Sequence, residues 1–218
     1  SKVQISGNWI GDGEPCFIIA EAGSNHNGSL EHAKNLISVA ADAQADAVKF
    51  QLFRAEKLYP TNAGNSDYLK SERSIYDIVS DMEMPYDWLS ELVNHCQEKG
   101  IMFLSSVFDE ESVDRLDPYV PAYKIASYEM THLPLVRYIA GKGKPVIIST
   151  GTADLEEVDE TVETFYETGN KDLMLMQCTA SYPAPLESLN LRAIPTLKSE
   201  FGVPVGLSDH SRDALVGP

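Results

Sequence analysis

The sequence is poor in cysteine and in basic residues, and it has no long hydrophobic run. Its three cysteines, Cys16, Cys96 and Cys178, form no CxxC pair and cannot all pair with one another, so a reduced cytoplasm fits them best. Lys and Arg number 17 against 33 Asp and Glu. The net charge of −16 argues against nucleic acid and anionic membranes as partners, because both need a positive protein surface. No stretch approaches the roughly 18 apolar residues of a membrane span, and residues 1–15 do not resemble a secretory signal.

The residues that are present fit a folded domain. Apolar residues make up 43% of the chain and charged residues 23%, close to the averages of globular proteins, which argues against disorder and against a coiled coil. A length of 218 residues suits one domain or two small ones. An anionic small molecule remains a candidate ligand, but only at a local cluster of lysines and backbone N–H groups.

Short apolar segments alternate with amphipathic helical stretches along the chain. Continuous apolar runs are typical of strands buried on both faces of a parallel sheet, and the alternation predicts an α/β fold. Ser29 is expected to cap the first helix, Gly100 to end the second, and Thr131 to precede the third. The predicted strands are 17–20, 47–51, 102–105, 122–125, 146–149, 173–178 and 205–208.

The spacing of these strands favours a barrel over an open sheet. The seven segments recur about every 31 residues, and an eighth would bring the chain to about 245, near the ~250 typical of a (β/α)8 TIM barrel. We therefore expect residues 1–218 to form an incomplete TIM barrel with seven units present and the eighth missing. Two explanations fit a barrel with seven units. The chain is a fragment of a longer protein, which we favour, or a neighbouring molecule covers the gap between the first and last strands.

One long insertion, at about 54–87, follows the second predicted strand. Loops of this length often form lids or binding surfaces, and a solvated excursion with a short helix of its own is the equal alternative. Its notable side chains are Tyr59, Tyr68, Lys70, Arg73 and Tyr76.

Polar residues gather where the predicted strands end, which in a TIM barrel is the end that carries the chemistry. Those considered as site residues are Glu21, Lys49, Gln51, Ser106, Lys124, Ser127, Glu129, Ser149, Tyr182, Ser208, Asp209 and His210. Residues 25–28 after the first strand (NHNG) fit either a functional loop or a simple polar turn.

Two lysines inside apolar runs of an acidic protein carry most of the functional argument. Burying the ammonium groups of Lys49 and Lys124 is costly unless each has an anionic partner. Glu21 and Glu129 are candidate internal partners, which would make the set structural. A phosphate or carboxylate ligand is the sharper interpretation, because nearby serines and loop N–H groups add neutral donors. His210 is a candidate metal ligand or acid–base group.

Six segments, in order along the chain, resemble the N-acetylneuraminate (sialic acid) synthase family, which includes legionaminic and pseudaminic acid synthases and spore-coat polysaccharide enzymes. The resemblance runs through essentially the whole chain, and the six together make it specific although no single one would. The segments are 17–28 (FIIAEAGSNHNG), 45–51 (ADAVKFQ), 123–129 (YKIASYE), 145–151 (PVIISTG), 177–183 (QCTASYP) and 205–211 (VGLSDHS).

The resemblance implies a (β/α)8 barrel that condenses phosphoenolpyruvate with N-acetylmannosamine or a related amino sugar and releases phosphate. It implies a divalent metal, Mn²⁺ or Mg²⁺, with His210 as the first of two metal-binding histidines and Asp209 supporting it. It implies that Glu21 lies near the reacting centre, that Glu129 orients water and that Tyr182 belongs to the sugar pocket. The residues that resemble the phosphoenolpyruvate cradle are Lys49, Lys124, Ser127, Ser149 and Ser208, with Ser106 and Gln51 beside them.

In that family the second metal-binding histidine lies on the eighth strand, and a C-terminal antifreeze-like domain completes a homodimer. Both are expected beyond Pro218. Two other interpretations stay open. One is a class I aldolase-type barrel in which Lys124 forms a Schiff base. The other is a truncated, non-catalytic barrel that serves assembly in polysaccharide biosynthesis.

Overall fold

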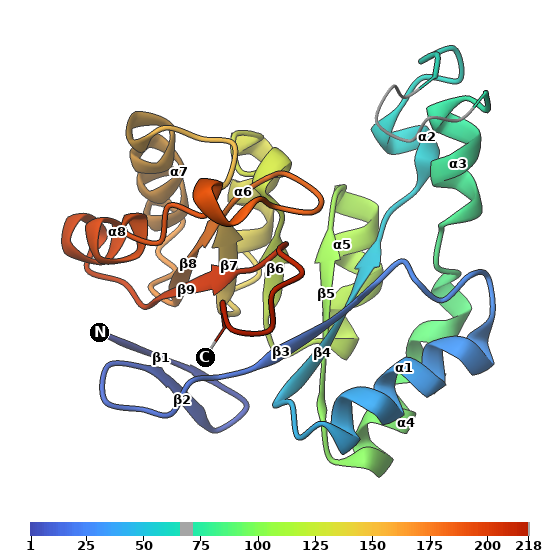
Figure 1. Ribbon diagram of the computed structural model, residues 1–218, viewed down its shortest axis with the longest axis horizontal. Coiled ribbons are helices and arrows are strands. Elements are labelled where there is room, and N and C mark those ends of the chain that lie inside the picture. Colours follow the sequence, from blue (N-terminus) through green and yellow to red (C-terminus); the bar gives the residue numbers. More distant parts are fainter. Residues whose placement is uncertain (66–71, 218) are drawn as a thin grey trace. The chain divides into compact units, whose positions relative to one another are not determined.

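The computed structural model describes residues 1–65 and 72–217, and the chain forms two compact units (Figure 1). The first unit is Phe17–Val120, and the second combines Ser1–Cys16 with Pro121–Pro218. Tyr68 and Lys70, named above in the insertion, lie outside the described residues. No helix within the described ranges has both the length and the apolar composition needed to cross a bilayer.

Three parallel strands form the sheet of the first unit. They pair in chain order, and the register sets Glu21 beside Lys49 and Gln51 beside Ser106. The rings of Phe50 and Phe103 stack in its core with centroids 5.8 Å apart. The strands are β3 (Ile19–Gly23), β4 (Ala47–Leu52) and β5 (Met102–Val107).

Two long helices, α1 (Leu30–Asp42) and α4 (Leu89–Lys99), lie side by side in this unit (Figure 1). The Ser29 hydroxyl accepts a hydrogen bond from the His32 backbone N–H at 3.2 Å, so the predicted cap is confirmed. Gly100 ends α4 with a left-handed φ of 69°, a conformation that favours glycine. Both helices bury an apolar stripe, with Ile37 and Leu92 fully buried.

Short helices occupy the rest of the first unit. Within the insertion, α2 (Ala55–Leu58) and α3 (Ile75–Asp81) confirm the expectation of a short helix of its own, whereas the lid remains a prediction. The others are η1 (Tyr86–Trp88), α5 (Glu110–Leu116) and η2 (Asp117–Tyr119).

A β-hairpin that the sequence analysis did not predict opens the second unit. It pairs β1 (Lys2–Ile5) with β2 (Asn8–Gly11) in antiparallel fashion and buries Val3 and Ile5. Just after it, Asp12 forms an ion pair with Lys198 of helix α8 (Ala193–Phe201), which fastens the first residues of the chain to this unit.

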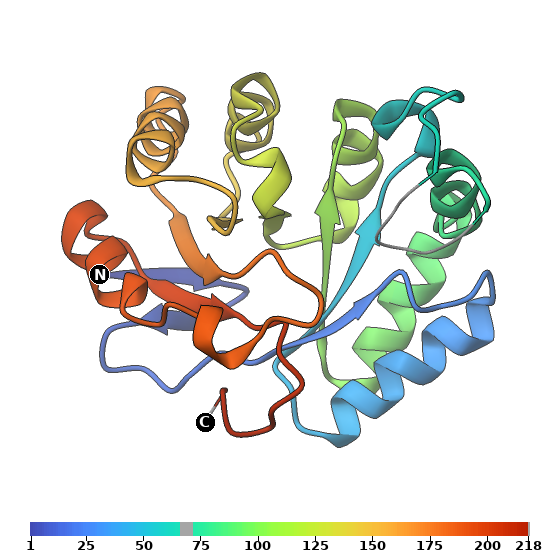
Figure 2. The same ribbon diagram turned by 45° about the horizontal axis from the view of Figure 1, so that its top comes forward.

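The remaining strands of the second unit pair in parallel, each with the next along the chain, and the last pairing sets Cys178 beside Ser208. Helices α6 and α7 lie next to each other outside these strands, and α8 lies beside β8 and β9 (Figure 2). The strands are β6 (Tyr123–Ile125), β7 (Val146–Ser149), β8 (Leu173–Cys178) and β9 (Val205–Ser208). The helices are α6 (Leu133–Ala140) and α7 (Leu155–Glu167), with short turns η3 (Ser127–Glu129) and η4 (Leu186–Ser188).

Local sequence explains where these helices begin. Asp154 caps α7 in a complete capping box, because its side chain accepts from the Glu157 N–H while the Glu157 side chain accepts from the Asp154 N–H. His132, one residue after the expected Thr131, is the residue before α6. All seven predicted strands are present, which confirms an α/β fold with parallel strands. The missing eighth unit of a barrel stays a prediction.

Candidate functional site

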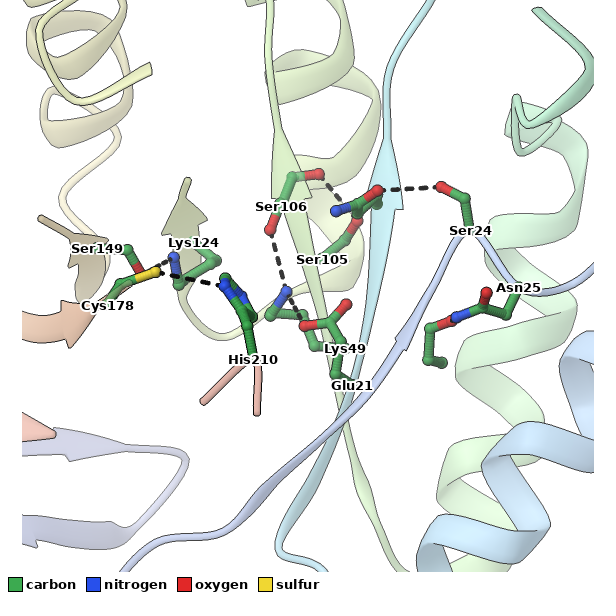
Figure 3. Close-up of polar contacts among 12 residues, drawn as sticks. Glu21, Ser24, Asn25, Lys49, Ser105, Ser106, Lys124, Ser149, Cys178 and His210 are labelled. Carbon is green, nitrogen blue, oxygen red and sulfur yellow. Dashed lines mark hydrogen bonds and ion pairs between the residues drawn. The ribbon is translucent and has the colours of Figure 1, made fainter. Parts of the chain in front are cut away.

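Polar side chains of the second unit gather at the carboxyl ends of its parallel strands, and Lys124 on β6 is the central one. It is 4% exposed, and its ammonium donates to Ser149 Oγ at 2.7 Å (Figure 3). The ammonium also donates to the Ile125 carbonyl at 2.6 Å. Ser149 is the last residue of β7. A buried cation among hydroxyls is a suitable donor to a phosphate or carboxylate group.

A second layer of contacts links the ends of β6, β7 and β8. The Ser127 hydroxyl accepts a hydrogen bond from the Gly151 N–H at 3.0 Å, and the Thr152 hydroxyl donates to the Ser127 carbonyl at 2.8 Å. Gly151 lies so close to Cys178 that an added Cβ would sit 2.7 Å from the Cys178 carbonyl oxygen and 2.9 Å from its sulfur. Only glycine allows this approach, and it holds the Ser127 hydroxyl in place.

Cys178, which the sequence analysis did not name as a site residue, lies at the centre of this cluster. Burial raises the pKa of its thiol, but hydrogen bonds from His210, Ser127 and Ser208 and the charge of His210 lower it more, so the net pKa lies below the ordinary value. Its position as the last residue of β8, in register with Ser208 at the end of β9, was the available sequence signal.

His210 is held by the segment that follows β8. Its Nδ1 lies 3.0 Å from the Thr179 carbonyl oxygen and 3.7 Å from the Cys178 sulfur. The Tyr182 ring stacks on the imidazole with centroids 4.2 Å apart and planes inclined at 30°. The neighbouring Asp209 is exposed, and its carboxylate accepts from the Ser211 N–H and hydroxyl, so its support of His210 stays a prediction.

Glu129 is the acidic group of this unit with the most perturbed environment. Burial raises the pKa of its carboxyl to about 7, against the lowering effect of a backbone hydrogen bond and of the Lys124 charge. Its Oε2 atom is buried and has no hydrogen-bond partner among residues 1–65 and 72–217. A carboxyl group of this kind titrates near neutral pH and can accept or release a proton there.

The first unit carries its own polar cluster at the ends of β3, β4 and β5. The Lys49 ammonium forms an ion pair with Glu21 and donates to Ser106 Oγ at 3.2 Å (Figure 3). The Gln51 amide oxygen accepts from the Ser24 hydroxyl at 3.1 Å. The side chains of Lys49 and Gln51 therefore lie on the same face of β4, as predicted.

The structure distinguishes the two lysines by their partners. Glu21 is the internal acid of Lys49, as one of the alternatives anticipated, yet half of the Glu21 side chain is exposed and can meet a solute. Lys124 donates to neutral oxygens and acts electrostatically on Glu129. Lys124 is thus the better placed of the two to bind an anionic ligand.

Residues 25–28 form a turn before α1, and the side chain of His26 within it is buried. It is fully buried, its Nδ1 accepts from the Gly28 N–H at 3.1 Å, and its ring meets Trp88 edge-on. Its Nε2 meets the geometric criteria for a hydrogen bond with no group in the described part of the chain, and burial lowers the pKa of the imidazole against the opposing effect of the Met82 backbone. The ring anchors the turn after β3 to the start of α4.

A divalent metal would find one suitable ligand in the second unit. Because a carbonyl oxygen only accepts, His210 Nδ1 is the protonated nitrogen, and a neutral ring then carries its lone pair on Nε2. This is the form in which histidine binds metals. Among the described residues no group of three or more His, Cys, Asp or Glu side chains could hold a metal by itself.

The chain is similar to enzymes of nonulosonic acid and polysaccharide biosynthesis. The spore coat polysaccharide biosynthesis protein SpsE of Bacillus subtilis is 45% identical over 218 residues, which cover 99% of this chain and 58% of SpsE. A pseudaminic acid synthase of Campylobacter jejuni is 42% identical over 211 residues, 94% of this chain and 61% of the synthase. The chain thus spans about three fifths of the length of these relatives.

A solved structure agrees with these similarities. The N-acetylneuraminic acid synthetase of Leptospira borgpetersenii, in complex with citrate, superposes with a TM-score of 0.91 at 33% identity, covering 100% of this chain and 73% of that one. The sequence also matches the NeuB family over residues 36–217. This chain therefore belongs to the NeuB family.

Proposed function

We propose that the protein condenses phosphoenolpyruvate with N-acetylmannosamine or a related amino sugar, forming a nonulosonic acid and releasing phosphate. The observation that carries the proposal is the buried Lys124 ammonium at the carboxyl ends of parallel strands, bonded to Ser149 and to a carbonyl oxygen. The names of the relatives support the product class, and the citrate in the Leptospira structure shows that a relative binds a polycarboxylate.

In the proposed reaction the enol carbon of phosphoenolpyruvate attacks the aldehyde carbon of the open-chain sugar, and the aldehyde oxygen becomes a hydroxyl. Water adds to the cationic carbon left behind, and the C–O bond to phosphate breaks. Lys124 and the hydroxyls of Ser127, Ser149 and Ser208 stabilise the phosphate charge as fixed donors. Glu129, with a pKa of about 7, takes the proton from the attacking water.

We further propose that His210 holds a divalent cation, Mn²⁺ or Mg²⁺, through Nε2. The cation, when bound, polarises the sugar aldehyde as a Lewis acid. In this chain the Thr179 carbonyl favours the tautomer with the hydrogen on Nδ1, in which the lone pair is on Nε2.

The test is calorimetric titration of the protein with phosphoenolpyruvate. Lys124→Met should lower the affinity about tenfold to hundredfold, because hydrogen bonds to charged groups contribute roughly 1.5–3 kcal/mol. Lys171→Met is the matched control, since it removes the same charge from an exposed site before β8 and should leave the affinity unchanged. Unaltered affinity in Lys124→Met, with the fold intact by circular dichroism, would contradict the proposed role of Lys124.

The same variant separates the alternatives. A Schiff-base aldolase would be trapped by borohydride in the presence of a keto acid, and Lys124→Met would abolish the trapping. A folded wild-type protein that binds no phosphoenolpyruvate would indicate the non-catalytic barrel.

A further inference from the structure

We propose that the segment 178–184 is a positioning element for His210, in which Cys178, Thr179 and Tyr182 fix the tautomer and the plane of the imidazole. The use of this arrangement for cation binding rests on the proposed function, whereas the arrangement itself rests on contacts within the second unit. Tyr182 then acts through His210, a role distinct from the sugar-pocket role that the resemblance implies.

The tautomer follows from the chemistry of the atoms around Nδ1. The Thr179 carbonyl oxygen, 3.0 Å away, accepts only, so Nδ1 carries the hydrogen. The Cys178 sulfur, at 3.7 Å, shares the same N–H as a second acceptor. The other tautomer would place the Nδ1 lone pair against the carbonyl oxygen of Thr179, which is repulsive.

The plane of the ring is fixed from a different direction. Tyr182 covers one face of the imidazole at a centroid separation of 4.2 Å, so rotation of the ring would break the stack. The backbone is held as well, because the Ala184 N–H donates to the His210 carbonyl at 2.9 Å. A single seven-residue segment thus constrains His210 at its backbone, at Nδ1 and on its face.

These constraints prepare Nε2 as the ligand atom. A fixed tautomer and ring plane spare the protein the cost of ordering the side chain when a cation binds, and groups that hold a ligating histidine typically change metal affinity 10–100-fold when removed. Tyr182 supplies the ring plane by stacking, so its hydroxyl is not needed for this role.

The first measurement is ¹⁵N NMR of the His210 ring at pH 8. The wild-type protein should show a pyrrole-type Nδ1 and a pyridine-type Nε2, and Tyr182→Phe should be the same. Tyr182→Ala should show exchange between ring orientations, and Cys178→Ala a smaller change of the Nδ1 shift. Tyr182 is half exposed, so its replacement should not prevent folding. Leu186→Ala, an exposed position in the same loop, is the matched control.

The second measurement is the Mn²⁺ concentration that broadens the His210 ring signals. It should rise tenfold or more in Tyr182→Ala and stay at the wild-type value in Tyr182→Phe and Leu186→Ala. A wild-type Nε2–H tautomer, or wild-type ring signals and broadening in Tyr182→Ala, would overturn the inference. A protein that behaves as expected in both measurements but fails to bind phosphoenolpyruvate contradicts the proposed function and leaves the inference standing.

Discussion

The raised pKa of Glu129 predicts that the protein loses stability as the pH rises through the neutral range. The carboxyl shifts from its ordinary pKa of 4.5 to about 7 because it is buried. Between these values the folded state keeps a proton that the unfolded chain has released. Ionising Glu129 in the folded state therefore lowers the free energy of unfolding. This loss is absent below about pH 4.5, complete above about pH 7, and amounts to about 3 kcal/mol.

The variant that isolates this effect is Glu129→Gln, which cannot ionise. Urea unfolding at pH 5 and pH 8 gives the change of unfolding free energy with pH for each protein, and a constant cost of the new amide cancels in this difference. Between pH 5 and pH 8 the wild type should lose about 2.5 kcal/mol more than the variant, a relative shift of about 1 M urea in the midpoint.

Glu160→Gln, which changes an exposed residue of α7, should follow the wild type. Equal pH dependence in wild type and Glu129→Gln would refute the reasoning, because Glu129 would then titrate outside this range or outside a buried site.

Three further predictions concern buried groups. Gly151→Ala should destabilise the protein by about 1–3 kcal/mol in thermal unfolding, because the new Cβ would overlap the Cys178 backbone; an unchanged midpoint would contradict the close approach. Ellman's reagent should label the exposed Cys16 rapidly and leave Cys96 and Cys178 unreacted until the protein unfolds, because these two thiols are buried. Burial also raises the pKa of the Cys96 thiol to about 12. Rapid labelling of more than one thiol would refute this prediction. Burial lowers the pKa of His26, so its contribution to the free energy of unfolding should be fully present above pH 6.5 and be lost as the pH falls below that value. His26→Phe should remove part of this loss of stability in acid. Identical acid unfolding profiles of the variant and the wild type would count against it.

Most of the parallel strands could be predicted because strands buried on both faces consist of continuous apolar runs, which are visible in the sequence. Ala47, Met102 and Val146 start strands where predicted, whereas the first strand starts at Ile19, two residues late. The N-terminal hairpin was missed although its signal was present. Its Ser6–Gly7 turn has positive φ at both residues, as two-residue hairpins require.

The site could be predicted only as a set of strand-end residues. Lys124 was identified as a lysine inside an apolar run and Ser149 as a polar residue at the end of one, and both stand out in the sequence. The contacts of His210 with Cys178 and Tyr182 could not be found this way, because they join the end of β8 and the loop after it to a loop about 30 residues further along the chain. The burial of His26 was equally hidden, since it depends on Trp88 from a distant helix start.

The hairpin and the ion pair of Asp12 with Lys198 have a consequence for synthesis on the ribosome. The two partners are 186 residues apart in the chain. At translation speeds of about 5–20 residues per second, roughly 10–40 s pass between the synthesis of the hairpin and the synthesis of α8, which carries Lys198. All of Phe17–Val120, the other compact unit, is made within that interval, so the first unit is complete in the nascent chain before the second, although the second unit contains the first residues to emerge.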